Sequence, residues 1–323
     1  MNGYVLVKGK AGLGNRMLSA MTGILYAMLS ERNLVVDWSD STYSDDGQNV
    51  FPKLFKVPNS ETQLPISASE SVRPSLWKGR LKQPAPEVIQ EIDPAAHRGS
   101  MALRRFSFDL SKLDYGEKTL VTLSYTQLIP KLRRHFRGQF SWLGKMSDED
   151  IMRWLLREVL VLREDIMTKV ESRWTKLAGG ETMIGVHVRF TDLKTTLGST
   201  YSAVDELIHS VPNYKLLLAT DNIGVQSAMI QRYKNVVTNE KWFPDEGATM
   251  HLSERCPDRL QNAIDALIDM YTLAKCQYLV FASSSTFSYI SSLISTMPRS
   301  NIIDIERNDP VLRLKKIARK FVI

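Results

Sequence analysis

The chain has 323 residues, of which 43% are hydrophobic and 24% are charged. This composition is typical of a globular protein and excludes a fibrous or disordered chain. The length predicts two domains of roughly 150 residues each, with a ligand site expected in the cleft between them.

The formal net charge is +7 and the pI is near 9.3. Such a protein can bind nucleic acid, an acidic membrane surface or a phosphorylated small molecule. The basic residues are scattered and form no zinc-finger, helix-turn-helix or RNP-like motif, so we expect no nucleic-acid partner. No apolar run reaches the roughly 18 to 20 residues of a membrane span, and residues 1–10 do not resemble a signal peptide, which predicts a cytoplasmic protein.

A strand, a glycine loop and a helix open the chain. Residues 4–9 are β-branched and apolar, and after "KAGLGN" the apolar residues of 16–31 recur at nearly helical spacing. Residues 33–38 predict a second strand, which should run parallel to the first because a helix connects them. The polar residues 39–49 predict an exposed loop.

The middle of the chain is less regular, and residues 58–118 support no assignment. A strand is predicted over 118–125. Ser147 and Asp150 resemble a capping box that opens one long helix through residue 176, which we expect to bridge the two domains.

The C-terminal half alternates regularly between strands and helices, which is typical of a doubly wound parallel sheet. The predicted strands are 183–188, 214–219, 235–238, 277–282 and 300–305, and the predicted helices are 201–210, 222–233, 259–274 and 285–296.

Polar clusters follow several of these strands, at the edge where open α/β sheets bind ligands and where helix N-termini attract anions. The clusters are "AGLGN" (11–15), "HVRFTD" (187–192), "ATDN" (219–222) and "SSSTFS" (283–288). Each also has a plain structural interpretation. The glycine loop is either a tight turn or a phosphate loop, and the serine run is either a helix N-cap or a phosphate site.

The charged residues leave similar alternatives open. Arg189 needs an anion, which is either a ligand phosphate or Asp192. Asp221 is either an N-cap or an acceptor for a ribose or a base, and Asp269 either lies on a solvated helix edge with Asp265 or is a buried acceptor.

No set of cysteines and histidines has metal-ligand spacing, and no D-x-D triplet adjoins a strand. We therefore expect no metal and no cofactor, with a phosphate held by arginine, serine and backbone N–H groups. Cys256 and Cys276 are too few for a disulfide framework, which agrees with a reducing compartment.

The strings "GVHVRFTD", "LLATDN" and "ALIDMYTLAKCQYLVFASSSTFS" occur in this order, and "AGLGNRMLSAMTGILYAMLSERNLVVDW" precedes them. Together they resemble the GDP-fucose-dependent fucosyltransferase superfamily, nearest the α1,6-fucosyltransferases and the rhizobial nodulation-factor fucosyltransferase. The resemblance implies a GT-B enzyme with two Rossmann-like domains that face each other across a cleft. It also implies transfer of L-fucose from GDP-fucose to a glycan hydroxyl, with inversion and without a metal.

The resemblance implies the domain limits as well. We expect an acceptor-side α/β domain over 1–150, a GDP-sugar-binding domain over 151–308 and a basic amphipathic helix over 309–323. That helix either rests on an anionic membrane, which would make the protein membrane-peripheral, or packs on its own domain.

Site residues follow from the resemblance by position. The resemblance implies that Arg189 and Ser285 contact the β-phosphate, with Ser284 beside them. It implies that His187 lies at the nucleotide edge, with Asp192 in support. The guanosine would contact Asp221 and Asp269, and the pyrophosphate would contact main chain of Gly12 and Gly14. Asn15 would orient the acceptor or the departing phosphate.

Two departures from the family pattern leave the linkage and the base open. Phe190 follows Arg189, where α1,6 enzymes usually carry a second basic residue, and Leu197 stands where a carboxylate could act as general base. Our candidates for the base are Asp37, Asp40, Asp45 and Asp46. The alternatives are a transferase for another GDP-sugar and a non-catalytic nucleotide- or glycan-binding protein.

Overall fold

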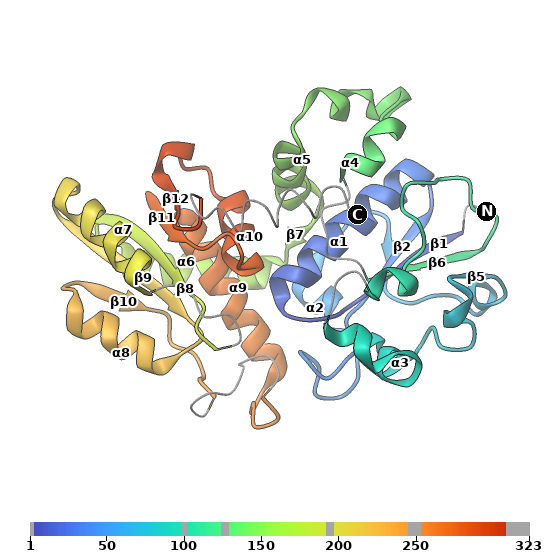
Figure 1. The fold of residues 1–323 in the computed structure, drawn as a ribbon, viewed down its shortest axis with the longest axis horizontal. Helices are drawn as coiled ribbons and strands as arrows, with labels where there is room; N and C mark the ends of the chain where they lie inside the picture. Colours follow the sequence, from blue (N-terminus) through green and yellow to red (C-terminus); the bar gives the residue numbers. More distant parts are fainter. Residues whose placement is uncertain (1–2, 99–101, 124–128, 192–196, 245–252, 308–323) are drawn as a thin grey trace. The chain divides into compact units, whose positions relative to one another are not determined.

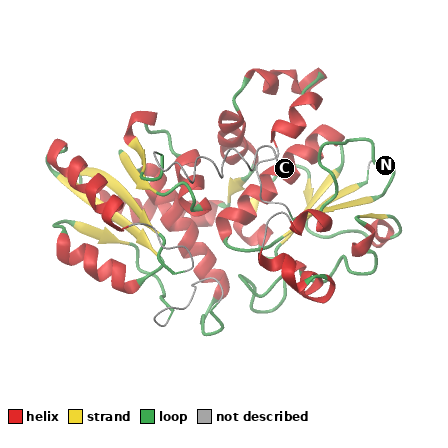
Figure 2. Ribbon diagram, viewed as in Figure 1, coloured by secondary structure: helices red, strands yellow, loops and turns green. Residues whose placement is uncertain are grey.

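The computed structural model describes residues 3–98, 102–123, 129–191, 197–244 and 253–307. The chain divides between Arg163 and Glu164 into two compact units, each built on a parallel sheet (Figures 1 and 2). The predicted fold class, α/β with mainly parallel sheets, is confirmed. Within the described ranges, no helix is long and apolar enough to cross a bilayer.

The first unit contains a five-stranded sheet of order β4-β2-β1-β6-β5, in which every pair is parallel. The strands are β1 (Tyr4–Lys8), β2 (Asn33–Asp37), β4 (Ser60–Glu61), β5 (Val72–Arg73) and β6 (Thr119–Thr122). The helices of this unit are α1 (Leu13–Ser30), α2 (Phe51–Leu54), α3 (Ala85–Ile92), α4 (Ile129–Leu132) and α5 (Asp148–Trp154).

Helix α1 connects β1 to β2, as the sequence predicted, and packs closely on the sheet. Gly23 permits this approach, because a Cβ at that position would lie 2.2 Å from Cγ2 of Val7. The carboxyl ends of β1 and β2, and the amino end of α1, therefore lie together at one edge of the sheet.

The loop after β2 differs from the prediction. Residues 39–49 form a loop, but Asp40, Tyr43 and Ser44 are buried. Asp40 is drawn inward because it pairs with the buried guanidinium of Arg16, as described below. The predicted exposed loop is therefore exposed only at Ser41 and over residues 45–48.

The single long helix predicted from Ser147 is wrong, although its start is confirmed. Ser147 caps α5 by accepting a hydrogen bond from Asp150 N at 3.1 Å. A five-residue π-helix over Leu155–Val159 and the strand β7 (Val161–Leu162) then interrupt the helix, because β7 pairs antiparallel with β3 (Phe55–Lys56). Residues 151–163 thus belong to the first unit, whereas we expected its limit at residue 150.

The second unit contains a sheet of order β10-β9-β8-β11-β12, again parallel throughout. The strands are β8 (Thr182–Val188), β9 (Tyr214–Thr220), β10 (Val236–Thr238), β11 (Tyr278–Phe281) and β12 (Ile302–Asp304). The helices are α6 (Glu164–Ala178), α7 (Leu197–Ser210), α8 (Ile223–Arg232), α9 (Arg259–Lys275) and α10 (Thr286–Ile294). The predicted alternation of this half is confirmed.

Helices cover both faces of this sheet (Figure 1). Ile184 and Val186 face α7 and α8, where Val204 and Met229 complete one apolar layer. Met183 packs on the opposite face with residues of α6 and α9. This doubly wound arrangement leaves the carboxyl edge of β8, β9 and β11 available for polar side chains.

Candidate functional site

The sheet of the second unit brings several predicted site residues to one edge. His187 lies at the end of β8 and Arg189 follows this strand. Asp221 follows the neighbouring strand β9, and Ser284 and Ser285 follow β11 on the other side of β8. Asp192 and the rest of the segment 192–196 lie outside the described residues.

His187 is buried and fixed by an aromatic contact. Its imidazole stacks on Phe287 of α10, with ring centroids 4.9 Å apart and planes inclined by 21°. Burial, then the positive charges of Arg189 and Lys241, lower the pKa of His187 to about 3. The ring is therefore neutral near pH 7, and its Nδ1 has no hydrogen-bond partner among the described residues.

Asp221 holds the chain that follows β8. Its carboxylate accepts a hydrogen bond from Phe190 N at 2.7 Å and another from the hydroxyl of Thr191 at 2.6 Å. The N-cap of α8 is Asn222, whose side chain accepts from Val225 N, so the N-cap interpretation of Asp221 is wrong. Asp221 instead holds the two residues that follow Arg189, through the N–H of Phe190 and the hydroxyl of Thr191.

The two serines before α10 differ in their hydrogen bonding. Ser284 donates its hydroxyl to Glu306 at 2.6 Å, and its N–H donates to the same carboxylate at 2.7 Å. Ser285 is the N-cap residue of α10 but makes no side-chain cap, and its buried Oγ has no partner among the described residues. The hydroxyl available for a ligand is therefore that of Ser285, whereas Ser284 is held by the protein.

Asp269 lies inside the second unit, so the solvated helix edge is wrong for this residue. It is 3% exposed and accepts hydrogen bonds from Lys241 Nζ at 2.5 Å and Asn239 Nδ2 at 2.7 Å. Asp265 on the same helix is half-buried, and burial raises the pKa of its carboxyl. Lys241 and Asn239 could not be predicted as partners of α9, since nothing in the short stretch "TNEKWF" marks them.

In the first unit, the predicted glycine loop opens α1. Gly12 is the N-cap residue of this helix and makes no side-chain cap, and Gly14 and Asn15 lie in its first turn. The N–H of Leu13 donates to the hydroxyl of Tyr43 at 2.9 Å. Arg16, which the sequence analysis did not consider, is fully buried directly behind this loop.

The four candidate bases have different environments. Asp37 accepts from Lys8 Nζ at 2.6 Å. Asp40 is 5% exposed and pairs with Arg16; burial alone would raise its pKa, but the charge and hydrogen bond of Arg16 hold the pKa below its usual value. The remaining two, Asp45 and Asp46, are exposed, and Asp46 accepts from Gln48 N at 2.9 Å.

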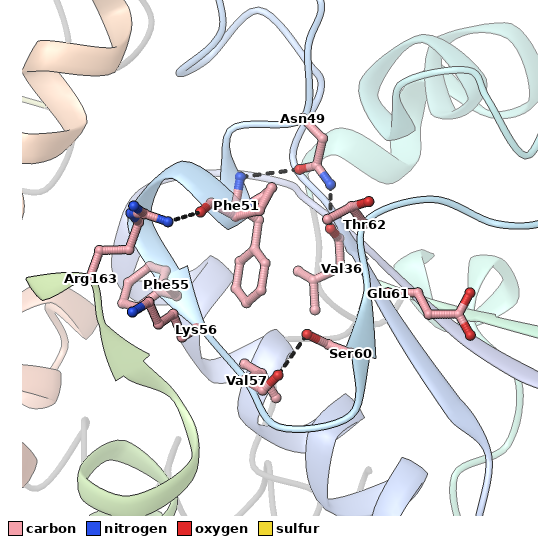
Figure 3. Close-up of a pocket in the computed structure, with 11 residues that line it drawn as sticks. Val36, Asn49, Phe51, Phe55, Lys56, Val57, Ser60, Glu61, Thr62 and Arg163 are labelled. Atoms are coloured by element: carbon pink, nitrogen blue, oxygen red, sulfur yellow. Dashed lines mark hydrogen bonds between the residues drawn. The ribbon is translucent and has the colours of Figure 1, made fainter.

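A separate pocket of about 240 Å³ adjoins the outer strands of the first unit (Figure 3). Its polar side chains serve the surrounding backbone, since Asn49 donates to Val36 O at 2.7 Å and Ser60 donates to Val57 O at 2.8 Å. None of the predicted site residues lines this pocket. Within the described ranges, no group of three or more histidine, cysteine, aspartate or glutamate side chains could hold a metal ion.

A fucosyltransferase family model and two nodulation proteins match this chain. Residues 2–68, which include the glycine loop and Arg16, match the xyloglucan fucosyltransferase family model. Nodulation protein Z of Sinorhizobium fredii is 23% identical over 96% of this chain and 95% of its own length, and that of Azorhizobium caulinodans is 25% identical over 90% and 88%. The chain resembles the GDP-fucose-dependent fucosyltransferases of the NodZ type. The predicted resemblance is thus confirmed.

Solved fucosyltransferases share the fold. The NodZ α-1,6-fucosyltransferase co-crystallised with GDP superposes with a TM-score of 0.63 at 21% identity, covering 91% of this chain and 93% of that one. A mutant of Arabidopsis thaliana FUT1 in complex with GDP gives a TM-score of 0.57 at 16% identity, covering 92% and 70%. The similarity to NodZ therefore extends over both units of this chain.

Proposed function

We propose that this protein is a glycosyltransferase that moves L-fucose from GDP-fucose to a hydroxyl of a glycan, with inversion at the anomeric carbon and without a metal ion. The relatives support the donor, because one structure of NodZ α-1,6-fucosyltransferase was obtained after soaking with GDP-fucose and another by co-crystallisation with GDP. Both sheets and their order along the chain fit such an enzyme.

The observation that carries the proposal is a pair of unpartnered polar atoms at the carboxyl edge of the second sheet. Nδ1 of His187 and Oγ of Ser285 are both buried and have no partner among the described residues. Buried polar groups are nearly always hydrogen-bonded, so such atoms are expected to meet a ligand or an ordered water. A phosphate at the start of α10 would accept hydrogen bonds there and would meet the positive end of the helix.

Arg189 would supply the charge that the neutral His187 does not. As the bond to fucose breaks, negative charge develops on the β-phosphate of GDP, and donors aimed at that charge are worth most in the transition state. A guanidinium can make two parallel hydrogen bonds to one phosphate. In this proposal Asp221 positions the backbone at Phe190, and hence the direction in which Arg189 leaves the strand.

Asp269 would contact the guanosine only through oxygen lone pairs that Lys241 and Asn239 leave available. Asn239 offers a further group, because its Oδ1 is buried without a partner among the described residues. This amide oxygen could accept a hydrogen bond from a guanine N–H. The guanosine contact is therefore assigned to the Asp269–Asn239 pair rather than to Asp269 alone.

The first unit would supply main-chain N–H groups of Gly12 and Gly14 to the pyrophosphate and the side chain of Asn15 to the acceptor. Its glycine loop lies in a basic environment. Burial, then the charge of Arg16, lowers the pKa of Lys10, and burial, then Lys10, lowers that of His97. Lys10 and Arg16 thus place two positive charges near one helix N-terminus, which favours an anionic ligand.

A second candidate, a nucleotide- or glycan-binding protein without turnover, is favoured by one observation. Asp40 pairs with the buried guanidinium of Arg16, which holds its pKa below the usual value, so this carboxylate is a weak proton acceptor. Asp37 is occupied by an ion pair with Lys8. Asp45 and Asp46, which are both exposed, are the remaining candidates for a base that we keep in the proposal. A transferase for another GDP-sugar is the third possibility.

Titration calorimetry with GDP, GDP-fucose and GDP-mannose, followed by a donor-hydrolysis assay, separates these functions. The proposal expects GDP-fucose to bind and to release GDP, and EDTA to leave the rate unchanged. Binding of GDP-fucose without any turnover supports the second candidate, and preference for GDP-mannose supports the third. Loss of turnover on EDTA treatment, restored by a divalent cation, contradicts the metal-free mechanism.

We also propose a cytoplasmic location, with no cofactor and no nucleic-acid partner. The basic C-terminal segment 309–323, for which a membrane contact was considered, lies outside the described residues. Liposome co-sedimentation of the full chain and of a form ending at Asn308 tests that contact. Equal pelleting of the two forms contradicts it.

A further inference from the structure

Arg16 is the most deeply buried charged residue near the glycine loop, at 0% exposure. Its Nε donates to the carbonyl of Ala11 at 2.7 Å, and its Nη2 donates to Asp40 Oδ1 at 2.8 Å. Its third nitrogen, Nη1, has no partner among the described residues. One side chain therefore connects the loop before α1 with the loop after β2, which are otherwise distant in sequence.

The backbone at Ala11 needs this support. Its φ is +63°, in the left-handed region that costs a non-glycine residue roughly 1 kcal/mol. The hydrogen bond from Arg16 holds the carbonyl of this same residue. The direction of the following N–H groups, at Gly12 and in the first turn of α1, depends on the conformation that is fixed here.

The surroundings leave the guanidinium a single position. Its central carbon lies 5.7 Å from the ring centroid of Trp38 and 5.2 Å from that of Tyr43. On the remaining side, a Cβ at Gly9 would lie 2.1 Å from Nη1. Tyr43 also accepts the N–H of Leu13, so both loops close around the start of α1.

Stability alone is a poor reason for such an arrangement. Burying an ion pair is often no more stabilising than apolar residues of similar volume would be, and here one guanidinium nitrogen is left without a partner. Such a pair fixes geometry instead. We infer that Arg16 is a positioning residue for the proposed transfer, because it holds Ala11 and Asp40 and so sets the direction of the glycine-loop N–H groups and of Asn15. This inference rests on the proposed function.

Arg16→Lys separates positioning from stability. Lysine keeps the charge beside Asp40, but a single ammonium cannot also reproduce the Nε bond to Ala11. We expect kcat for transfer or donor hydrolysis to fall about 10-fold to 100-fold, as small misplacements do. The proposal places the N–H groups of Gly12 and Gly14 at the pyrophosphate, so the dissociation constant of GDP should also rise, by about 3-fold to 10-fold. The melting temperature should fall by no more than about 2 to 4 °C, as expected for the loss of one hydrogen bond.

Arg32→Lys is the matched control. This arginine follows the other end of α1 and donates to the carbonyls of Tyr115 and Glu117, far from the glycine loop. Its kcat should remain within about twofold of the wild type. Wild-type kcat in Arg16→Lys, or an equal loss in Arg32→Lys, overturns the inference.

A second readout does not depend on turnover. Amide hydrogen exchange in residues 9–16 should be faster in Arg16→Lys, with the other peptides of the first unit unchanged. If the wild-type chain neither binds GDP nor turns over GDP-fucose, the proposed function fails. Amide hydrogen exchange alone then tests whether Arg16 positions the glycine loop. Unchanged exchange in residues 9–16 contradicts the role of Arg16.

Discussion

The imidazole of His187 lies flat against the ring of Phe287, 4.9 Å away, and carries an Nδ1 that no described residue satisfies. The aromatic contact holds the ring at the carboxyl end of β8 in one orientation. A buried, neutral and oriented histidine can present a hydrogen bond to a ligand without adding charge. Its protonation has a consequence for folding that can be measured.

His187 should make the protein less stable in mild acid. The pKa of the folded state is about 3, below the usual value of 6.5, so the unfolded chain binds a proton at this residue first. The contribution of the neutral ring to the free energy of unfolding is therefore complete above pH 6.5 and is lost as pH falls toward 3. The free energy of unfolding should decrease by about 2 kcal/mol between pH 6.5 and 5 relative to His187→Phe, which cannot titrate. Urea unfolding at both pH values measures this difference. An equal pH dependence of the free energy of unfolding in the wild type and in His187→Phe would contradict it.

The adjacent serines should respond differently to replacement by alanine. Ser285→Ala removes a buried hydroxyl that has no partner among the described residues, so the free energy of unfolding should not decrease, while GDP affinity should fall about 10-fold to 100-fold. Ser284→Ala removes the bond to Glu306 and should cost about 1 kcal/mol of stability with little effect on GDP affinity. Calorimetry and urea unfolding test both variants, and the reverse pattern would contradict the assignment of the ligand hydroxyl.

Breaking the buried pair of Asp269 and Lys241 should destabilise the second unit. Asp269→Leu leaves the ammonium of Lys241, which is 8% exposed, without its carboxylate, at a cost of about 3 to 5 kcal/mol. Adding Lys241→Met should recover much of that loss. If GDP affinity stays low in the stable double variant, Asp269 also contacts the nucleotide. A single variant as stable as the wild type would contradict the buried ion pair.

Replacing Arg189 should reduce turnover strongly. Arg189→Ala should lower kcat/KM for GDP-fucose by about 100-fold or more, the usual loss when a transition-state donor is removed. Arg189→Lys should lose most of the same activity, since an ammonium cannot make two parallel bonds. Steady-state kinetics with both variants measure this, and near-normal turnover in Arg189→Ala would remove Arg189 from the proposed site.

The sequence predicted the strands and helices of the second unit well because hydrophobic periodicity reports directly on a doubly wound sheet. It marked His187 and Ser285 as candidates because His187 lies at the end of a strand and Ser285 follows one, where such sheets expose polar groups. The long helix from Ser147 failed because the pairing of β7 with β3 depends on a strand about a hundred residues earlier in the chain, which no local pattern reports.

Side-chain partners were the least predictable part. Asp40 was expected in an exposed loop, yet Arg16, 24 residues away, draws it into the interior. Lys241 meets Asp269 over 28 residues, and Glu306 meets Ser284 over 22. In each case a buried charge or helix terminus requires a partner, but the chain can supply it from many positions.

The most direct test of the central claim is a mass-spectrometric screen of the full chain with GDP-fucose and a panel of glycans. The account predicts release of GDP and, for at least one glycan, a product heavier by one fucose, formed in equal amount. Glycans that remain unmodified throughout, with no GDP released and no binding of GDP or GDP-fucose by calorimetry, would contradict it.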